Sequence, residues 1–471
     1  MSGALGLLVA GLLCLASTTA HANGRLPGAT GLALHPSDER QLLLGLSFGL
    51  ALTRDGAASF RWMCEQQIEG NGGDVDPSIV VTGDGTLVVI SLTNGGVLVS
   101  RDDGCSFERA LGPLEGNRGV DLTLDPSRSG HVLALMSKIV EVSDAGYPRF
   151  HNFVAHSLDH GRSWEVLAEL PDDMLPETLE VAAADPKRIY VSGAGAASPL
   201  QGIIERSDDG GLSWKRTTVD LPRGSGSLFV SGIHPKDPDR VWFRVPGRGD
   251  VSGLLPARLW RSTDGAATFS QVAASSTGML GFAVSPDGDR IAFGGPMEGL
   301  FVAPADASAA PVRVSDLSVH CLRWAVSGLY LCASEPIDPF SLGHAAEPTE
   351  AFVPLWHRAD TCLATCAASS RIEQTCRKAW QTIEPLVSAR ADLCGGSSAP
   401  AASIDAGSEA ERARTDAGND PAFDASSVEL APMPAPSAAS TGGCTVGFSP
   451  DAGTPWWLSA MLIFVASLLC F

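Results

Sequence analysis

Two short patterns alternate along most of this chain of 471 residues, and a regular repeat constrains a fold more strongly than any other sequence feature. In the first pattern, an apolar strand, a tight turn and a second apolar strand follow one another. Its seven turns lie at His35-Pro36, Gly83, Asp125-Pro126, Asp185-Pro186, His234-Pro235, Ser285-Pro286 and Ser327. Subtracting successive turn positions gives spacings of 48, 42, 60, 49, 51 and 42 residues, which is the length of a four-stranded blade. The pattern predicts an all-β, seven-bladed β-propeller, and six or eight blades are the alternatives.

The second pattern, Ser/Thr-x-Asp-x-Gly-x-Ser/Thr-aromatic, follows each of the first five turns. It reads TRDGAASF from Thr53, SRDDGCSF from Ser100, SLDHGRSW from Ser157, SDDGGLSW from Ser207 and STDGAATF from Ser262. These segments resemble the Asp-box, or BNR, repeats of sialidase-like and sortilin-like propellers, and the resemblance covers roughly residues 29–354.

The resemblance implies that each segment closes the hairpin between the third and fourth strands of a blade. The aspartates Asp55, Asp102, Asp159, Asp209 and Asp264 would then bind amides of the turn, and each aromatic residue would pack between blades. Ala57 and Ala266 stand where the second glycine is usual, so we expect these two turns to differ in shape. In the seventh blade, Glu347 and Phe352 occupy the positions of the aspartate and the aromatic residue.

Segments of other kinds flank the repeats. An apolar run followed by Ala20-His21-Ala22 predicts a signal peptide over residues 1–22, and hence an exported protein. The predicted propeller spans 23–358, a cysteine-rich helical appendage 359–394 and a disordered linker 395–443. The remaining residues, 444–471, resemble the C-terminal sorting tails of myxobacterial surface proteins, which implies processing and an anchor on Cys444. The alternative is a plain C-terminal membrane anchor. With either kind of tail we expect an exported protein at the cell surface or associated with the outer membrane, and a secreted protein is the other possibility.

Eight cysteines lie between the signal peptide and the tail, an even number that favours disulfides over a metal site in an exported chain. They are Cys64, Cys105, Cys321, Cys332, Cys362, Cys366, Cys376 and Cys394. Their pairing stays open; Cys64 with Cys105 and Cys321 with Cys332 are two hypotheses. The amphipathic run Arg371–Val387 predicts a helix that the cysteines fix to the propeller.

Charge and motifs exclude several function classes. Acidic residues outnumber basic ones by 53 to 33, which disfavours a nucleic-acid partner. We find no P-loop, no HExxH and no EF-hand ligand pattern, and we expect a monomer without cofactor or metal. A sialidase would need a tyrosine nucleophile with an acidic partner, but Tyr190 and Tyr330 fall inside strand patterns and Tyr147 has no acidic neighbour.

Long connections between second and third strands occur in blades three to five, over Met136–Asn152, Gly193–Gly202 and Arg244–Arg258. Loops of this length are more often functional than short ones. Arg244, Arg248, Arg258 and Trp260 are the candidate contact residues. We therefore predict a non-enzymatic cell-surface propeller that binds a glycan or protein ligand through these loops. The alternatives are a secreted sialidase-like glycoside hydrolase and an assembly factor for an envelope complex.

Overall fold

The computed structural model describes residues 27–394 apart from 69–75, 92–95, 143, 145, 196–200, 223, 224, 226, 248, 251, 252, 255 and 391. The predicted signal peptide, the linker and the tail with Cys444 lie outside this range. Within it, no helix is long and apolar enough to cross a membrane.

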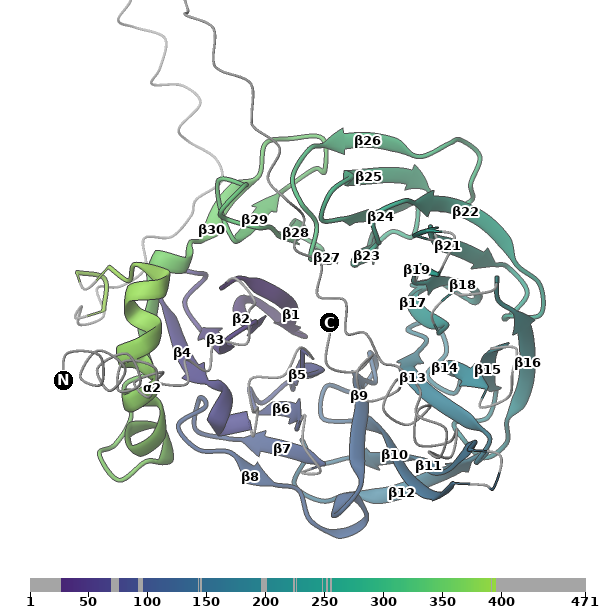
Figure 1. Ribbon diagram of the computed structural model, residues 1–471, viewed down its shortest axis with the longest axis horizontal. Helices are drawn as coiled ribbons and strands as arrows, with labels where there is room; N and C mark the ends of the chain where they lie inside the picture. The colour runs from purple at the N-terminus through teal and green to yellow at the C-terminus, as the bar shows by residue number, and fades with distance from the viewer. Residues whose placement is uncertain are drawn as a thin grey trace, which may run out of the picture. The chain divides into compact units, whose positions relative to one another are not determined.

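Seven antiparallel sheets of consecutive strands form a ring, as Figure 1 shows, so the predicted seven-bladed β-propeller is confirmed. Blade one contains β1 (Ala29–His35), β2 (Asp38–Leu46), β3 (Gly49–Thr53) and β4 (Phe60–Cys64). Blade two contains β5 (Ile79–Val81), β6 (Leu87–Ile90), β7 (Val97–Ser100) and β8 (Glu108–Arg109). Blade three contains β9 (Arg118–Leu124), β10 (Val132–Val142), β11 (Pro148–Ser157) and β12 (Glu165–Leu170).

The remaining blades repeat this order. Blade four contains β13 (Met174–Val181), β14 (Ile189–Gly195), β15 (Gln201–Ser207) and β16 (Lys215–Asp220). Blade five contains β17 (Phe229–His234), β18 (Asp237–Val245), β21 (Ala257–Ser262) and β22 (Ser270–Ser275), with a small ribbon of β19 (Gly249–Asp250) and β20 (Gly253–Leu254). Blade six contains β23 (Gly281–Val284), β24 (Arg290–Gly295), β25 (Gly299–Pro304) and β26 (Val312–Ser315). Blade seven contains β27 (Cys321–Ala325), β28 (Gly328–Cys332), β29 (Leu342–Ala345) and β30 (Val353–Trp356).

The first strand of every blade lies nearest the centre of the ring (Figure 1), and we call these the axial strands. Because each sheet is antiparallel, alternate connections emerge at opposite ends. The turns between strands one and two, and between strands three and four, share one side, which we call the turn face. The connections between strands two and three, and from blade to blade, share the other, the loop face. All seven predicted turns join first to second strands on the turn face.

The five Ser/Thr-x-Asp turns join third and fourth strands, and their hydrogen bonds explain the residue pattern. In blade three, Oδ1 of Asp159 accepts hydrogen bonds from the Ser157 hydroxyl and the Ser163 amide, while Oδ2 accepts one from the Ser163 hydroxyl. The Ser157 hydroxyl oxygen also accepts the Gly161 amide. Equivalent bonds surround Asp55, Asp102, Asp209 and Asp264.

The expectation that Ala57 and Ala266 reshape their turns is wrong. Both residues have left-handed backbones, with φ of 72° and 68°, as do the glycines at the same position in the other turns. Their amides donate to the Thr53 and Ser262 hydroxyls just as the glycine amides do. The aspartate and hydroxyl contacts therefore hold the turn in a conformation that costs an L-residue roughly 1–2 kcal/mol.

Apolar cores lie between successive blades. The aromatic residue after each turn joins such a core: Trp164 packs with residues of blades two and three, and Trp214 with residues of blades three and four. Phe107 packs with residues of blades one and two, and Phe269 with residues of blades four and five. Phe60 contacts Trp356 across the seam between blades one and seven. The seams are thus sealed by residues that the repeat itself specifies.

The ring closes without exchange of a strand between its first and last blades. Blades one and seven are each built from consecutive strands, and axial strands β1 and β27 meet side by side (Figure 1). The Arg323 guanidinium donates to the Leu32 carbonyl oxygen, and the Glu39 carboxylate accepts the amides of Val326 and Ser327.

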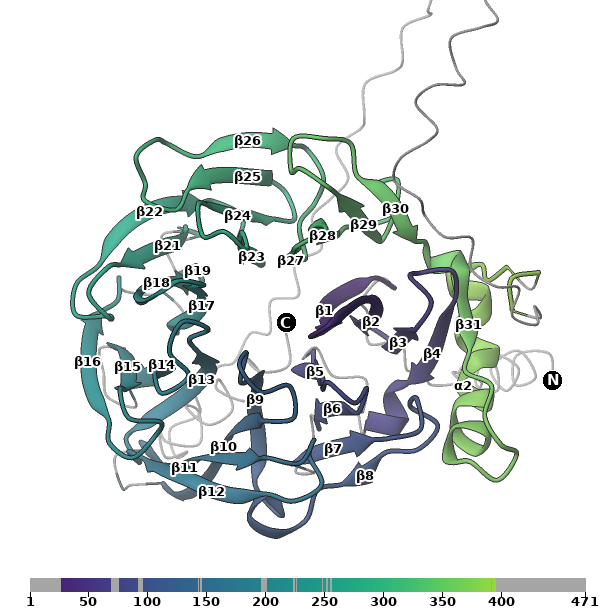
Figure 2. The same ribbon diagram turned by 180° about the vertical axis from the view of Figure 1, so that it is seen from behind.

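The appendage packs on the outer side of blade one, next to the seam between blades one and seven. After the short helix η4 (Arg358–Asp360), strand β31 (Thr361–Leu363) pairs in parallel with β4 as a fifth strand of blade one. Helix α2 (Arg371–Val387) then lies along the outer edge of β4, visible from the back in Figure 2. Two further 3-10 helices, η2 (Glu65–Ile68) and η3 (Gly112–Leu114), follow β4 and β8. Helix α2 has the same bounds, Arg371–Val387, as the helix predicted from the sequence.

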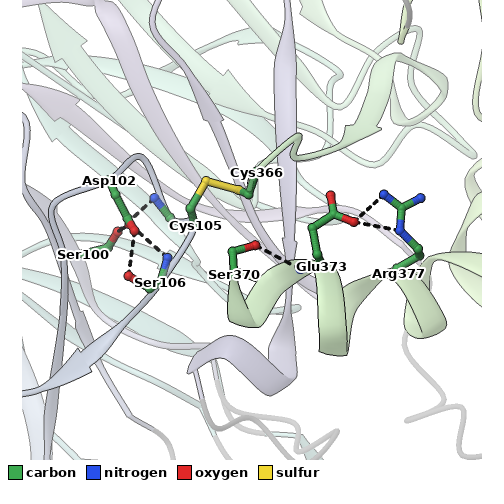
Figure 3. The surroundings of a disulfide bond; sticks show 9 residues. Ser100, Asp102, Cys105, Ser106, Cys366, Ser370, Glu373 and Arg377 are labelled. Carbon is green, nitrogen blue, oxygen red and sulfur yellow. Dashed lines mark hydrogen bonds and ion pairs between the residues drawn. A yellow bond between two sulfur atoms is a disulfide. The ribbon is translucent and has the colours of Figure 1, made fainter. Parts of the chain in front are cut away.

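Four disulfides connect the eight cysteines. Cys64 pairs with Cys376, and Cys105 pairs with Cys366 (Figure 3), so the appendage is bonded to blades one and two. The predicted bridge between Cys64 and Cys105 is therefore wrong, because each of these two cysteines bonds to a cysteine of the appendage. The Cys321–Cys332 pairing is confirmed between paired strands β27 and β28, and Cys362–Cys394 lies within the appendage.

Candidate functional site

On the loop face, the connection between strands two and three of blade three is described for nearly its whole length. It was expected as a loop over Met136–Asn152, but β10 and β11 continue through most of it as a hairpin. Pairing with β9 ends at Ser137, and pairing with β12 ends at Asn152. Beyond these residues the two strands pair only with each other in the described range. We call residues 138–151 the projecting hairpin.

Apolar side chains of the projecting hairpin face water. Ile139 is 58% exposed, Val140 58% and Val142 59%, and Tyr147 at the turn is also exposed. Five consecutive residues of β10, from Lys138 to Val142, are exposed, so both faces of the ribbon are open. By contrast, the corresponding connections of blades one and six are only 47–48 and 296–298.

Ion pairs hold the base of the hairpin in place. Arg149 bonds to Asp172 on the following blade-to-blade connection and lies 3.2 Å from Glu141. His151 Nε2 lies 3.1 Å from Glu169. An isolated two-stranded ribbon is only marginally stable in water, so these contacts fix the direction in which the hairpin leaves the blade. The neighbouring Asp173 pairs with Arg216, which gives both acids of the Asp172-Asp173 pair a structural partner.

The candidate residues of blade five have separate surroundings. Arg244 donates to the carbonyl oxygens of Met279 and Leu280 and stacks over Phe229, and burial lowers its pKa to about 10. Trp260 packs against Phe269 with ring centroids 6.2 Å apart, inside the core between blades four and five. Arg258 is partly exposed, with one 3.5 Å contact to the Pro256 carbonyl oxygen. Arg248 lies outside the described residues, as do 196–200 of the predicted blade-four loop.

Sequence reasoning missed two carboxyl groups on the axial strands. Asp121 on β9 accepts hydrogen bonds from the amides of Leu122 and Leu179, both at 2.9 Å. Glu180 on β13 lies next to blade three, with its Oε2 3.4 Å from the Thr123 hydroxyl. Arg323 on β27 acts electrostatically on both groups. The three residues come from blades three, four and seven, so only closure of the ring assembles them.

The axial position changes the acidity of both carboxyl groups. Burial raises the pKa of Asp121 to about 6. Burial, followed by repulsion from the Asp121 carboxylate, raises the pKa of Glu180 to about 7. Both groups are therefore protonated more readily than an exposed carboxyl group, and the charge of Asp121 favours the protonated form of Glu180 further. A signal was present in the sequence, since acidic residues interrupt two apolar first-strand patterns.

One of the two axial carboxyl groups also has a structural function. Leu122 donates its amide to the Ser78 hydroxyl, Leu179 to Asp121, and Val230 to the Thr178 hydroxyl. In each case an axial side chain, or one just before an axial strand, binds the backbone of the next blade. Asp121 therefore belongs to a series of blade-to-blade hydrogen bonds, whereas Glu180 has no such backbone contact among those described.

Tyr190 and Tyr330 do not form the acid-tyrosine pair of a sialidase. Tyr190 is buried and donates to the Pro238 carbonyl oxygen at 2.7 Å, and Tyr330 packs against His344 with ring centroids 4.5 Å apart. Burial raises the pKa of both phenols, which disfavours the phenolate that a nucleophile needs. Tyr147 lies on the projecting hairpin. Among the described residues, no cluster of histidine, cysteine and acidic groups suits a metal ion.

No protein-family model and no curated protein matches this chain. Solved structures do resemble it. A hydrazine synthase chain of Kuenenia stuttgartiensis has a TM-score of 0.50 at 13% identity, covering 68% of this chain and 97% of that one. An ancestral GH74 enzyme has a TM-score of 0.46 at 13% identity, covering 63% of this chain and 39% of its own. The α-L-arabinofuranosidase of Fusarium graminearum, a GH93 enzyme, has a TM-score of 0.36 at 16% identity, covering 52% and 83%. At these identities the likeness concerns the fold alone. The chain is a β-propeller.

Proposed function

We propose that this chain is an exported, surface-displayed Asp-box propeller that binds a protein partner through the loop face of blades three to five. The projecting hairpin carries this proposal. Its exposed Ile139, Val140 and Val142 present apolar area to water on a ribbon whose two faces are both open, which favours burial against a partner. Its two strand edges lack further pairing in the described range, and free edges can accept a strand from another chain.

The proposed partner is a protein because of the chemistry of the hairpin. β-branched aliphatic side chains bury apolar area but offer no hydrogen bonds to sugar hydroxyls. The ion pairs of Arg149 and the contact between His151 and Glu169 surround the base of the hairpin, which places polar groups beside the apolar residues. The signal peptide and the C-terminal tail, both read from the sequence, support display outside the cell.

A charge placed on the hairpin tests the proposal. Biolayer interferometry would measure binding of the purified protein to fractionated envelope proteins, with the bound species identified by mass spectrometry. We expect Ile139→Asp to weaken binding at least tenfold. Val312→Asp is the matched control, because Val312 is 63% exposed on β26 of blade six, away from the hairpin. Equal binding by both variants and the native protein would contradict a role for the hairpin.

A second candidate function is glycoside hydrolysis, which the axial carboxyl pair favours. Glycosidases with two carboxyl groups need one that stays protonated near neutral pH and one that is ionised. Glu180, with its higher pKa, would be the acid, and Asp121 would be the base or nucleophile. A panel of fluorogenic glycosides tests this: Glu180→Gln should abolish turnover while the projecting hairpin variants keep it. A panel without turnover by the native protein would eliminate this candidate.

A further inference from the structure

A cavity of about 630 Å³ opens on the turn face over blades one and two, on the opposite side from the projecting hairpin. This volume is within the roughly 300–1,000 Å³ of small-molecule sites. We call it the turn-face cavity. Its walls include Gln41, Arg54, Thr86, Arg101, Asp103 and Arg162, which come from blades one, two and three.

The cavity lies over two of the blades in which a position held by arginine in blades four and five has another residue. The blades can be aligned on the first residue of each Ser/Thr-x-Asp turn. This serine or threonine pairs with one residue of strand two, and that residue is equivalent in each of these blades. The residue before it is Arg188 in blade four and Arg240 in blade five, as the registers Ile189↔Ser207 and Val241↔Ser262 show. In blades one and two, the registers Leu42↔Thr53 and Leu87↔Ser100 place Gln41 and Thr86 there.

In blade four this arginine fills the seam. Arg188 bonds to Asp239 of blade five and lies 2.7 Å from Asp208, with its side chain only 13% exposed. Arg206 completes the network by donating to the Gly265 carbonyl oxygen. The shorter Gln41 and Thr86 cannot reach across the seam in this way. The space that remains is the turn-face cavity.

The lining groups are charged but balanced. Three arginines (Arg54, Arg101 and Arg162) face three aspartates (Asp38, Asp84 and Asp103). Arg54 is fixed by Asp103, Gln41 and the Gly85 carbonyl oxygen. Arg101 is bound more loosely, through a contact of 3.5 Å to Glu108. An ion of either sign would therefore meet as much repulsion as attraction.

Arginine only donates hydrogen bonds and an ionised aspartate only accepts them, whereas a hydroxyl group does both. A ligand with several neutral hydroxyl groups can therefore satisfy adjacent arginines and aspartates at once. We infer that the turn-face cavity binds an uncharged glycan, through Arg101 and Asp103 in particular. This site is separate from the protein-binding surface proposed above and does not depend on it.

A glycan array that contains neutral, sialylated and sulfated oligosaccharides tests this inference with the full-length protein. We expect binding to neutral members, and titration calorimetry with the best of them would give the affinity. Thr86→Arg restores the arginine of blades four and five and should weaken binding at least tenfold by filling the cavity. Arg101→Ala, a smaller change at the rim, should have an effect of similar size.

A control separates loss of this site from a general effect on the protein. Val312→Asp on β26, which belongs to none of the proposed sites, should leave glycan affinity unchanged. Thermal unfolding would show that each variant is folded before its affinity is compared. The inference is overturned if no neutral oligosaccharide binds, if only acidic ones bind, or if Thr86→Arg and Arg101→Ala both bind as tightly as the native protein.

Discussion

Carboxyl groups in this protein divide into two kinds that respond to pH in opposite ways. Asp209 and Asp264 in the turns are stabilised as anions: the Ser213 hydroxyl lowers the pKa of Asp209 to about 2, and the Thr268 hydroxyl lowers that of Asp264 to about 2. Their contribution to stability is present above the ordinary value of 3.8 and is lost as pH falls towards 2. On the axial strands, burial instead favours the protonated forms of Asp121 and Glu180.

The raised pKa of Glu180 predicts a stability effect that does not depend on any activity. Between its ordinary value of 4.5 and about 7, the folded state binds more protons than the unfolded state, so stability falls as pH rises. Glu180→Gln removes this penalty. We expect the variant to be more stable than the native protein at pH 8 and equally stable below pH ~4.5, as measured by urea unfolding. Glu350→Gln, at an exposed position, is the control, and the same shift in both variants at pH 8 would contradict the assignment.

The ends of helix α2 are set by contacts between neighbouring residues, whereas its position on blade one is set by packing. The Ser370 hydroxyl accepts the Glu373 amide at the N-terminus, and Glu373 pairs with Arg377 one turn later (Figure 3). The helix ends at Ser388, whose φ of 54° is left-handed. These contacts define where α2 begins and ends. Its position depends on buried Ile372 and Cys376, and on Trp380, whose ring lies 5.3 Å from that of Trp62.

Truncation of Trp380 measures how strongly the helix holds the blade. We expect Trp380→Ala to lower the free energy of unfolding by about 2 kcal/mol, less than for a fully buried tryptophan because its side chain is only partly covered. Lys378→Ala on the exposed side of the same helix should have almost no effect. Equal effects of the two changes in denaturant unfolding would show that α2 does not pack on blade one in the way described.

At the scale of the molecule, closure depends on two kinds of bonding. The axial strands of blades one and seven meet without a shared strand, while the appendage bonds to blades one and two across sequence separations of 312 and 261 residues. The two disulfides are nested. Once either is formed, the other closes only a smaller loop made of the chain from 64 to 105 and from 366 to 376.

Nesting predicts that the two bonds are equivalent. Removing either pair, by Cys64→Ser with Cys376→Ser or by Cys105→Ser with Cys366→Ser, should cost the same, about 4 kcal/mol, because the same small loop is released. Removing both pairs also releases the large loop and should cost more than twice as much. Urea unfolding of the three variants measures these values. A large difference between the two single-pair variants would show that native packing, and not chain closure, sets their effect.

The sequence by itself determined the features that depend on neighbouring residues. The seven turns, the five Ser/Thr-x-Asp hairpins and helix α2 follow from hydrogen bonds and apolar spacing within a few residues, and their repetition implied the ring. The Cys321–Cys332 bond also joins adjacent strands. Tertiary structure alone decided the contacts between distant segments. The partners of Cys64 and Cys105 lie about 300 positions away, and Asp121, Glu180 and Arg323 meet only when the ring closes. Whether Gln41 and Thr86 leave a cavity depends on the neighbouring blade, which no local pattern describes.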